Sequence, residues 1–262
     1  MQTDLETGKS APVMSDADFE ALAQLALKEY GLSLAESKKP LVHSRLSRRL
    51  RALNLSSFSS YIKILSNPKE KQERLELISA LTTNVTSFFR EKHHFDTLKT
   101  HTIETLIPKA RSGDRVRIWS SACSTGQEPY SIALTILDEC REANDLDIKI
   151  LATDIDPAVV ARAKQATYPT EEISSIPKRL QTAFTTPQNK TNEAFYLCNA
   201  VRQLVTFAEL NLISNWPFTG PFDIIFCRNV AIYFNQETQR SLWKSLTDKL
   251  HTNGYLFIGH SE

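Results

Sequence analysis

The chain has 262 residues, of which 41% are hydrophobic and 23% charged, and its formal net charge is +1. This composition is typical of an ordinary globular protein with one or two cores. No apolar run approaches the roughly 20 residues of a membrane span, and the polar N-terminus has no signal-peptide core. We therefore expect a cytoplasmic protein that does not insert into a membrane.

The cysteines and histidines give no pattern of metal ligands. The four cysteines are far apart in the sequence and form no CxxC pair. Free thiols in a reducing compartment are the simplest interpretation, and neither a disulfide framework nor a zinc site is supported. His93 and His94 are interpreted as the polar start of a helix, so we expect no bound metal.

The first part of the chain is predicted to be helical. Residues 1–14 are polar and predicted to be disordered. Ser15 can cap a helix whose apolar stripe precedes Gly31, and Pro40 opens a second helix. Further helical patterns cover residues 56–65 and 69–81. Residues 15–81 are therefore predicted to form a small all-α domain.

The charge of this part of the chain reverses sharply. Residues 1–36 carry two lysines against seven acidic residues, whereas residues 38–51 carry six basic residues and no acid. On a helical wheel, Arg45, Arg48 and Arg49 lie opposite a leucine stripe. A solvated helix face is the ordinary interpretation of such a run. A reversal this local favours instead a partner surface made by these arginines and Arg51.

An α/β pattern follows a connector at residues 82–114. A short apolar run at 116–119 leads into a loop of small residues and then into a helical run at 132–137. A second apolar run, 148–151, ends close to Asp154. Strand, turn and helix in this order form the first unit of a nucleotide-binding fold, in which an acid after the second strand usually grips a ribose diol.

The loop after the first strand indicates which nucleotide would bind. It holds one glycine, Gly126, whereas a dinucleotide fingerprint has three. A tightly held pyrophosphate is therefore not expected, which makes a nicotinamide dehydrogenase the least favoured interpretation. The inferred ligand has adenosine and no phosphate, namely S-adenosylmethionine, with S-adenosylhomocysteine as its product.

An insertion interrupts this pattern between residues 168 and 207. It contains three prolines and an alternating apolar pattern at 194–205, which predict a small antiparallel sheet. The predicted fold class is therefore α/β, with a small N-terminal all-α domain before a Rossmann-like class I methyltransferase domain at 115–262. The inserted β-subdomain belongs to the second domain.

Four separated segments resemble the CheR family of chemotaxis receptor methyltransferases. They are LTTNVTSFFRE at 81–91, SSACSTGQEPYS at 120–131, FDIIFCRNVAIYF at 222–234 and GYLFIGHSE at 254–262. The resemblance runs from about Leu41 to the last residue. It implies an enzyme that uses S-adenosylmethionine to form methyl esters on glutamate side chains of receptor cytoplasmic helices, which gives sensory adaptation. It also implies a monomer.

The resemblance assigns roles to individual residues. The residues expected to bind the cofactor are Asn84, Thr86, Arg90, Glu128, Asp154, Asn211, Leu212, Arg228 and Asn229. Arg90 and Tyr233 are expected to act in catalysis, with Tyr233 orienting the accepting carboxylate. Glu128 could instead be a first-turn acid favoured by the helix dipole, and Tyr233 an ordinary core residue.

The resemblance also gives the basic helix a partner, the acidic surface of a receptor's cytoplasmic domain. Nucleic acid would be the generic partner of such a patch, but no aromatic residues are interleaved with the cations. Two other functions remain open: a non-catalytic adaptor that binds the cofactor and docks on receptors, and a class I methyltransferase with another substrate.

Three departures from the family pattern concern particular positions. Gln127 stands where many relatives have a second acid, and the loop at 185–193 lacks the glycines of members that bind a receptor pentapeptide tether. Tethering is therefore not expected. Relatives also continue for some two dozen residues beyond the point that matches Glu262. A truncated or shortened chain would leave a sheet edge exposed.

Overall fold

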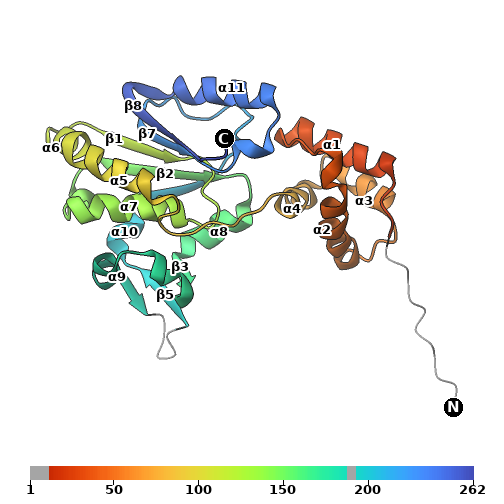
Figure 1. Cartoon of the computed structure of the whole chain (residues 1–262), viewed down its shortest axis with the longest axis horizontal. Helices are drawn as coiled ribbons and strands as arrows, with labels where there is room; N and C mark the ends of the chain where they lie inside the picture. The colour runs from red at the N-terminus through yellow and green to blue at the C-terminus, as the bar shows by residue number, and fades with distance from the viewer. Residues whose placement is uncertain (1–11, 188–192) are drawn as a thin grey trace, which may run out of the picture. The chain divides into compact units, whose positions relative to one another are not determined.

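The computed structural model describes residues 12–187 and 193–262, and the chain divides into two compact units, Met1–Thr83 and Asn84–Glu262 (Figure 1). Most of the predicted disordered tail, residues 1–11, lies outside the described residues. Of the remaining three residues of that tail, Val13 is exposed, whereas Pro12 and Met14 contact the helical unit. Met14 is buried, and a ring nitrogen of His43 is 2.8 Å from the Pro12 carbonyl oxygen.

The first unit is all helical in its described part, as predicted. Its α-helices are α1 (Asp16–Tyr30), α2 (Lys39–Ala52), α3 (Phe58–Leu65) and α4 (Lys71–Leu81). The apolar stripes of these helices meet in one core, where Leu22, Leu46 and Tyr61 are fully buried. Within the described residues of the whole chain, no helix is both long and apolar enough to cross a membrane.

The boundaries of α1 follow from its capping residues. Ser15 and Asp18 form a reciprocal capping box, in which the Ser15 hydroxyl accepts from the Asp18 N–H and the Asp18 carboxylate accepts from the Ser15 N–H. Gly31 ends the helix in the left-handed conformation (φ 71°), which glycine adopts at little cost.

The second unit is built on a five-stranded parallel sheet. Its order is β6-β2-β1-β7-β8, so β6 and β8 form the two edges. The strands are β1 (Val116–Ser120), β2 (Ile148–Asp154), β6 (Val205–Glu209), β7 (Phe222–Cys227) and β8 (Leu250–Ile258). The central strand β1 is flanked by β2 and β7, and every residue of β7 is buried. This arrangement confirms the predicted Rossmann-like fold.

Helices cover both faces of this sheet. The predicted connector is helical, with α5 (Lys92–His101), a π-helical turn (Thr102–Leu106) and α6 (Ile107–Arg111). Helix α5 lies with α7 (Gln127–Glu139) on one side of the sheet, and α11 (Gln236–Thr247) lies on the other (Figure 1). Helix α8 (Pro157–Gln165) follows β2, and its N-terminus is capped by Asp156.

The inserted subdomain is a three-stranded antiparallel sheet of order β3-β5-β4. It consists of β3 (Thr167–Pro169), β4 (Thr185–Pro187) and β5 (Ala194–Leu197), with helix α9 (Lys178–Phe184) before β4. The alternating pattern at 194–205 predicted a small antiparallel sheet, and its first four residues form a strand of that sheet. The strand ends at Leu197, because Val201 and Leu204 then follow at helical spacing and α10 (Asn199–Gln203) buries them. Residues 188–192 of the predicted glycine-poor loop lie outside the described residues.

Candidate active site

The loop between β1 and α7 is held at the carboxyl edge of the sheet by both neighbouring strands. The Ser121 N–H donates to the Phe226 carbonyl of β7 at 2.9 Å, and the Cys123 N–H donates to the Thr153 carbonyl of β2 at 2.9 Å. In parallel α/β sheets, ligands bind at this edge, next to a strand where the chain order reverses. The position of β1, between β2 and β7, is such a point.

The single glycine of this loop is needed for the turn. Gly126 has φ 97° and precedes α7, and a side chain there would meet the Tyr168 hydroxyl at 2.8 Å and the Ala163 Cβ at 2.9 Å. The glycine therefore allows close packing against α8 and β3. It does not form a cradle of several glycines for a pyrophosphate, in agreement with the inferred phosphate-free ligand.

Asp154 is the last residue of β2 and is buried, with 9% of its surface exposed. Its carboxylate accepts from the Ser124 N–H at 2.8 Å and from the Asp156 N–H at 3.1 Å. Burial raises the pKa of Asp154, while these backbone N–H groups oppose the rise. Two donors leave carboxylate lone pairs that can accept hydrogen bonds from ribose hydroxyls, so the residues present fit an adenosine ligand.

Hydrogen bonds join Asp154 to two other segments that were predicted to bind the cofactor. The Ser124 hydroxyl donates to the Asn84 carbonyl at 3.0 Å, and the Leu210 N–H donates to the Asp154 carbonyl at 2.9 Å. Leu210 precedes Asn211 and the buried Leu212, and Thr86 lies two residues after Asn84. Both segments are thus tied to the end of β2, the one at Asn84 through Ser124 and the one at Leu210 directly.

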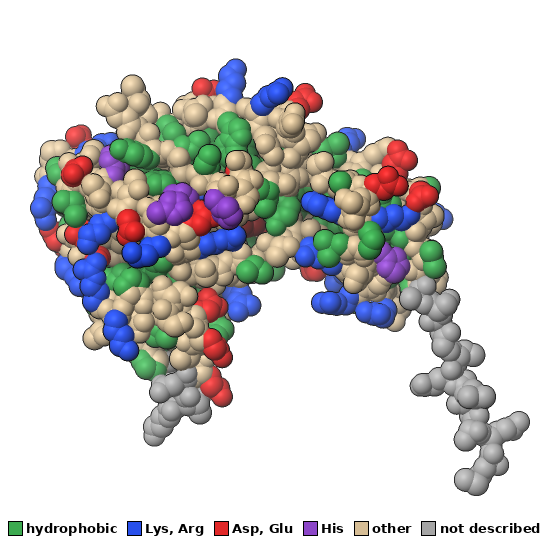
Figure 2. Space-filling model, in the orientation of Figure 1, with side chains coloured by type: hydrophobic (Ala, Val, Ile, Leu, Met, Phe, Trp, Pro, Cys, Tyr) green, Lys and Arg blue, Asp and Glu red, His purple; other side chains and the backbone are tan. Residues whose placement is uncertain are grey.

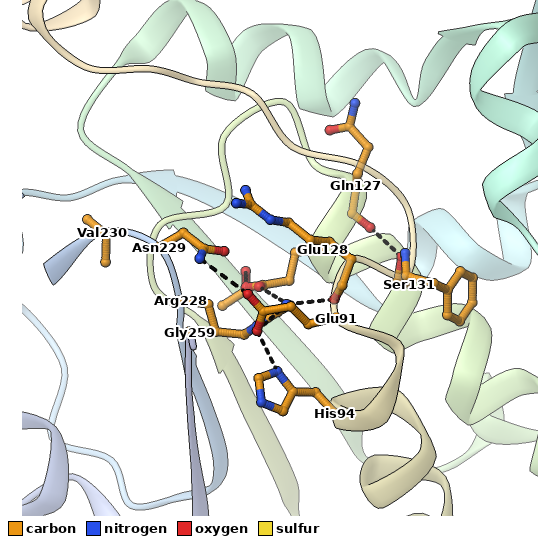
Figure 3. Close-up of polar contacts among 12 residues, drawn as sticks. Glu91, His94, Gln127, Glu128, Ser131, Arg228, Asn229, Val230 and Gly259 are labelled. Atoms are coloured by element: carbon orange, nitrogen blue, oxygen red, sulfur yellow. Dashed lines mark hydrogen bonds and ion pairs between the residues drawn. The ribbon is translucent and has the colours of Figure 1, made fainter. Parts of the chain in front are cut away.

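A second group of predicted residues meets around Arg228, which follows β7 and is buried, with 5% exposed (Figure 3). Its Nη1 lies 3.0 Å from Glu128 Oε2, and its Nη2 donates to the Arg90 carbonyl at 2.6 Å. Nη2 also lies 3.2 Å from Glu91 Oε2. The guanidinium therefore binds two carboxylates and a backbone carbonyl of the protein itself.

Glu128 stands in the first turn of α7, and the protein engages both of its carboxylate oxygens. Oε1 accepts from the Ser120 hydroxyl at 2.7 Å, and Oε2 pairs with Arg228. Burial raises the pKa of Glu128, and the charge of Arg228 opposes that rise. The position in the first turn fits the helix-dipole interpretation. The link to Arg228, across the site, is a further role that the helix dipole does not explain.

Glu91 is a central residue of this group, and sequence reasoning gave it no role. Its Oε1 lies 2.9 Å from His260 Nδ1 and accepts from the Asn229 side-chain amide at 3.3 Å. Burial alone would raise the pKa of Glu91, but the bond to His260, the charge of Arg228 and the bond to Asn229 lower it to about 2. Glu91 is therefore a carboxylate at neutral pH. The only available signal was its place beside Arg90 in the first motif.

The same carboxylate belongs to a group with the spacing of metal ligands. Ligand atoms of Glu91, His93 and His94 all lie within 4.8 Å of one another. However, the Arg228 guanidinium, a fixed cation, is already paired with Glu91, and it would repel a metal ion at this carboxylate. Burial and the charge of Arg228 lower the pKa of His94 to about 4, so His94 is neutral at pH 7.

The predicted catalytic residues lie on the segments joined by this group. Tyr233 ends a 3₁₀ turn, Ala231–Tyr233, and is half-buried, whereas its neighbour Phe234 is buried. Glu262 holds the start of this turn, since its Oε1 accepts from the N–H groups of Val230 at 2.6 Å and Ala231 at 2.9 Å. Sequence reasoning gave Glu262 no role.

Arg90 keeps much of its side chain available in the described structure. Its Nη1 donates to the Val85 carbonyl at 3.0 Å, and the side chain is half-buried. Because the Arg90 carbonyl is fixed by Arg228 at the same time, the backbone of this residue is anchored while its guanidinium can reach a ligand.

In the first unit, the predicted docking arginines divide into two pairs. Arg45 and Arg49, which the helical wheel placed opposite the packed leucines, are half-buried and bound to α4 instead. Arg49 binds the buried Glu73 through Nε at 2.7 Å and Nη2 at 2.5 Å. Arg45 donates to the carbonyls of residues 80–82 at the end of α4. Both side chains therefore hold α2 against α4.

Arg48 and Arg51 are the exposed pair of this predicted surface. Figure 2 shows Lys and Arg side chains gathered near α2 on the helical unit. Lys39 on the same helix is paired with Asp16 of α1. The wheel placed the arginines opposite the leucines, but the guanidinium of a long side chain can reach around the helix to a neighbour.

The comparisons with known proteins match both units. The all-alpha domain of CheR methyltransferases matches residues 17–82, and the SAM-binding domain of CheR methyltransferases matches residues 84–262. This chain belongs to the CheR methyltransferase family. It therefore has a domain that binds S-adenosylmethionine, and the resemblance inferred from four motifs is confirmed.

Individual CheR relatives are similar over most of this chain. A probable chemotaxis protein methyltransferase of Rhizobium etli is 46% identical over 88% of this chain and 87% of its own length. The chemotaxis protein methyltransferase of Escherichia coli is 40% identical over 95% of this chain and 85% of its own length. Chemotaxis protein methyltransferase 2 of Pseudomonas aeruginosa is 42% identical over 94% of this chain and 86% of its own length.

Proposed function

We propose that this CheR protein transfers the methyl group of S-adenosylmethionine to glutamate side chains on the cytoplasmic helices of chemotaxis receptors. The observation that carries the proposal is that both units match a CheR domain: the first unit matches the all-alpha domain, and the second matches the SAM-binding domain that contains the site. The names of the relatives, chemotaxis protein methyltransferases, support a chemotaxis protein as the substrate. The glutamate ester is the chemistry that the family resemblance implies.

The proposed reaction needs alignment more than it needs acid–base groups. A glutamate carboxylate is ionised at neutral pH and is already a nucleophile. One of its oxygens bonds to the methyl carbon as the carbon–sulfur bond breaks, and the bonding electrons stay on sulfur to give S-adenosylhomocysteine. A negative oxygen and a positive sulfur become neutral products, so excluding water from the pair favours the reaction.

The site residues divide into binding and orienting roles in this proposal. Asp154 holds the ribose, while Asn84, Thr86, Asn211 and Leu212 border the nucleoside on the segments tied to β2. The group around Arg228 borders the methionine portion. There Arg90 offers a free guanidinium face to a carboxylate, and the Tyr233 hydroxyl orients the accepting glutamate.

Receptor docking belongs to the first unit in this proposal. Arg48 and Arg51 are exposed on α2 and can meet an acidic helical surface. Arg45 and Arg49 contribute indirectly, because their bonds to α4 hold α2 in place.

The proposal is tested by incubating the protein with S-adenosylmethionine labelled in its methyl group and a receptor cytoplasmic fragment. Label on the fragment that is released by base as methanol identifies a carboxyl methyl ester. Base-stable label would indicate a class I methyltransferase that acts on another group. Cofactor and receptor binding without transfer would indicate a non-catalytic adaptor.

A further inference from the structure

The turn that carries the predicted catalytic residue Tyr233 begins in an uncommon backbone conformation. Asn229, which follows Arg228 at the end of β7, has a φ of 58°. This left-handed region is rare for residues other than glycine, although asparagine tolerates it. Such a conformation persists where the surrounding structure fixes it, and it is common at active sites. The contacts that hold Asn229 therefore bear on where the residues after it lie.

Asn229 shares this conformation with other residues of the site. In the described part of the chain, six non-glycine residues have a positive φ, and four of them lie on segments around the site: Phe89, Glu91, Ser124 and Asn229. The Asn229 side-chain amide donates to Glu91 at 3.3 Å (Figure 3). This bond holds the side chain of Asn229, and the backbone that follows needs an anchor of its own.

Glu262 supplies that anchor. Its Oε1 accepts from the N–H groups of Val230 at 2.6 Å and Ala231 at 2.9 Å, and its Oε2 accepts from the Gly259 N–H. One carboxylate thus joins the loop after β7 to the loop after β8. Bonds from a carboxylate to backbone N–H groups are charge-assisted, and they are therefore stronger than bonds between neutral groups.

Gly259 allows these two loops to approach each other. A Cβ at residue 259 would meet Glu262 Oε2 at 2.6 Å, Asn229 Nδ2 at 2.7 Å and the Asn229 backbone nitrogen at 2.9 Å. A larger residue would therefore displace Asn229 or Glu262. The same carboxylate lies close to Glu128 of the site. Burial is the main cause that raises the pKa of Glu128, and the charge of Glu262 adds to that rise.

We propose that Glu262 is a positioning residue for methyl transfer, because it fixes the turn that places the Tyr233 hydroxyl against the accepting carboxylate. The N–H groups of Val230 and Ala231 lie where the 3₁₀ turn Ala231–Tyr233 begins. A carboxylate that binds both groups sets the direction in which this turn leaves Asn229. Glu262 acts through Tyr233, whose own role rests on the proposed function.

The first measurement reports the surroundings of Tyr233 in the absence of a methyl acceptor. In protein labelled with 3-fluorotyrosine, the fluorine NMR resonance of Tyr233 is identified by its loss in Tyr233→Phe. Glu262→Gln removes the charge and one of the two carboxylate oxygens that accept from the turn and from Gly259. The Tyr233 resonance should therefore shift. A contribution to stability alone would leave the resonance of the folded protein in place.

The second measurement asks whether Glu262 and Tyr233 act together in catalysis. The kcat for methylation of a receptor cytoplasmic fragment, at saturating S-adenosylmethionine, should fall about tenfold in Glu262→Gln, because a misplaced orienting group slows the reaction. The double variant with Tyr233→Phe should be about as slow as Tyr233→Phe alone. Independent effects would instead multiply, to a loss of about a hundredfold.

Two further variants keep the test decisive. Gly259→Ala displaces the same loops without altering Glu262, and it should shift the Tyr233 resonance in the same way. Asp223→Asn is the matched control, because Asp223 is also a carboxylate that accepts a backbone N–H, from Arg117 at 2.8 Å, but it lies at the other end of β7. It should leave both the Tyr233 resonance and kcat near their wild-type values.

An unmoved Tyr233 resonance in Glu262→Gln overturns the proposal, and the same result in Gly259→Ala does so if Glu262→Gln is unfolded. So does an equal shift in Asp223→Asn, or a double variant in which the two losses of rate multiply. A wild-type protein that methylates no receptor fragment would count against the proposed function instead. The resonance, which needs no acceptor, would still decide whether Glu262 holds Tyr233 in place.

Discussion

At the scale of single residues, the site consists largely of polar groups that bind one another. The motifs correctly brought Arg90, Glu128, Arg228 and Asn229 together, but the structure shows Arg228 occupied by protein carboxylates. The spacing of residues in the sequence predicts at which strand end a side chain lies. Which group that side chain binds depends on residues that are far away in the chain. Glu91 was missed for this reason, because its four partners come from three separate segments.

Replacement of Asp154 tests the ribose contact. Asp154→Ala removes an acceptor whose charge-assisted hydrogen bonds each contribute about 1.5–3 kcal/mol, so S-adenosylhomocysteine should bind at least tenfold more weakly in calorimetry. The carboxylate also holds the Ser124 N–H. Asp154→Asn, which keeps one acceptor oxygen for the loop, should therefore show an intermediate loss. Wild-type affinity in both variants would remove Asp154 from the cofactor site.

The Tyr233 hydroxyl is expected to act in the transition state. Tyr233→Phe keeps the ring in its half-buried position and removes only the hydroxyl. The methylation rate constant should fall about tenfold or more, with cofactor affinity nearly unchanged, because the interaction is made in the transition state. Neighbouring Phe234→Leu is the contrasting change, since it should lower stability through lost packing. A full-rate Tyr233→Phe enzyme would make Tyr233 an ordinary packing residue.

His94 makes the stability of the second unit sensitive to acid. Its pKa is lowered from 6.5 to about 4 by burial and by the charge of Arg228, so folding favours the neutral ring. The resulting stability is complete above pH 6.5 and is lost as the pH falls toward 4, by up to about 3 kcal/mol. In denaturant titrations between pH 7 and pH 4, the free energy of unfolding should fall with decreasing pH, and this slope is the predicted effect of His94.

In His94→Gln, most of this slope between pH 6.5 and 4 should disappear. The same substitution at His251, which is exposed on β8, is the control and should leave the slope in place. An equally steep slope in both variants would assign the acid sensitivity to other groups.

At the scale of elements, periodicity and capping residues predicted most helices and strands, and the exceptions have local causes. Ser15 and Gly31 mark helix boundaries that the structure shows. The alternation at 194–205 predicted the inserted antiparallel sheet but not the end of its strand, because a strand of four residues is followed closely by a short helix and apolar residues continue across the junction. The burial of Arg49 could not be predicted from α2 alone, because its partner Glu73 lies on α4.

The division of the α2 arginines into two pairs predicts that adjacent residues contribute very differently to the free energy of unfolding. Arg49→Ala leaves the buried Glu73 carboxylate without its bidentate partner, and it should lower the free energy of unfolding by about 2–4 kcal/mol. Arg48→Ala removes an exposed side chain and should change that free energy by less than about 0.5 kcal/mol. Urea titration of both variants compares them directly, and equal losses would contradict the division.

We expect the exposed pair, Arg48 and Arg51, to promote the association of the protein with its receptor. Reversal of Arg48 and Arg51 to Glu should raise the apparent Michaelis constant for receptor and flatten its dependence on salt, since exposed charges act within a screening length of about 8–10 Å. Cofactor affinity should not change. Lys63→Glu, an exposed charge reversal on α3, is the control. Methylation that is indifferent to the double reversal and to salt would make these arginines solvated residues only.

At the scale of the whole molecule, the chain joins a helical unit to a parallel-sheet unit whose site lies at the carboxyl edge of β1, β2 and β7. The order of the four motifs was enough to identify the family, because each motif falls on a strand end or on a segment bonded to one. Their contacts were not predictable, since they join residues more than a hundred positions apart, such as Glu91 and His260.

The central claim is that the methyl group of S-adenosylmethionine reaches a glutamate side chain of a receptor. Tandem mass spectrometry of a receptor cytoplasmic fragment, after incubation with the protein and methyl-deuterated S-adenosylmethionine, tests this claim most directly. The account predicts deuterated methyl on glutamate side chains, absent when cofactor is omitted and much reduced with Asp154→Ala. Deuterated methyl on another residue type, or none on a fragment that binds the protein, would contradict it.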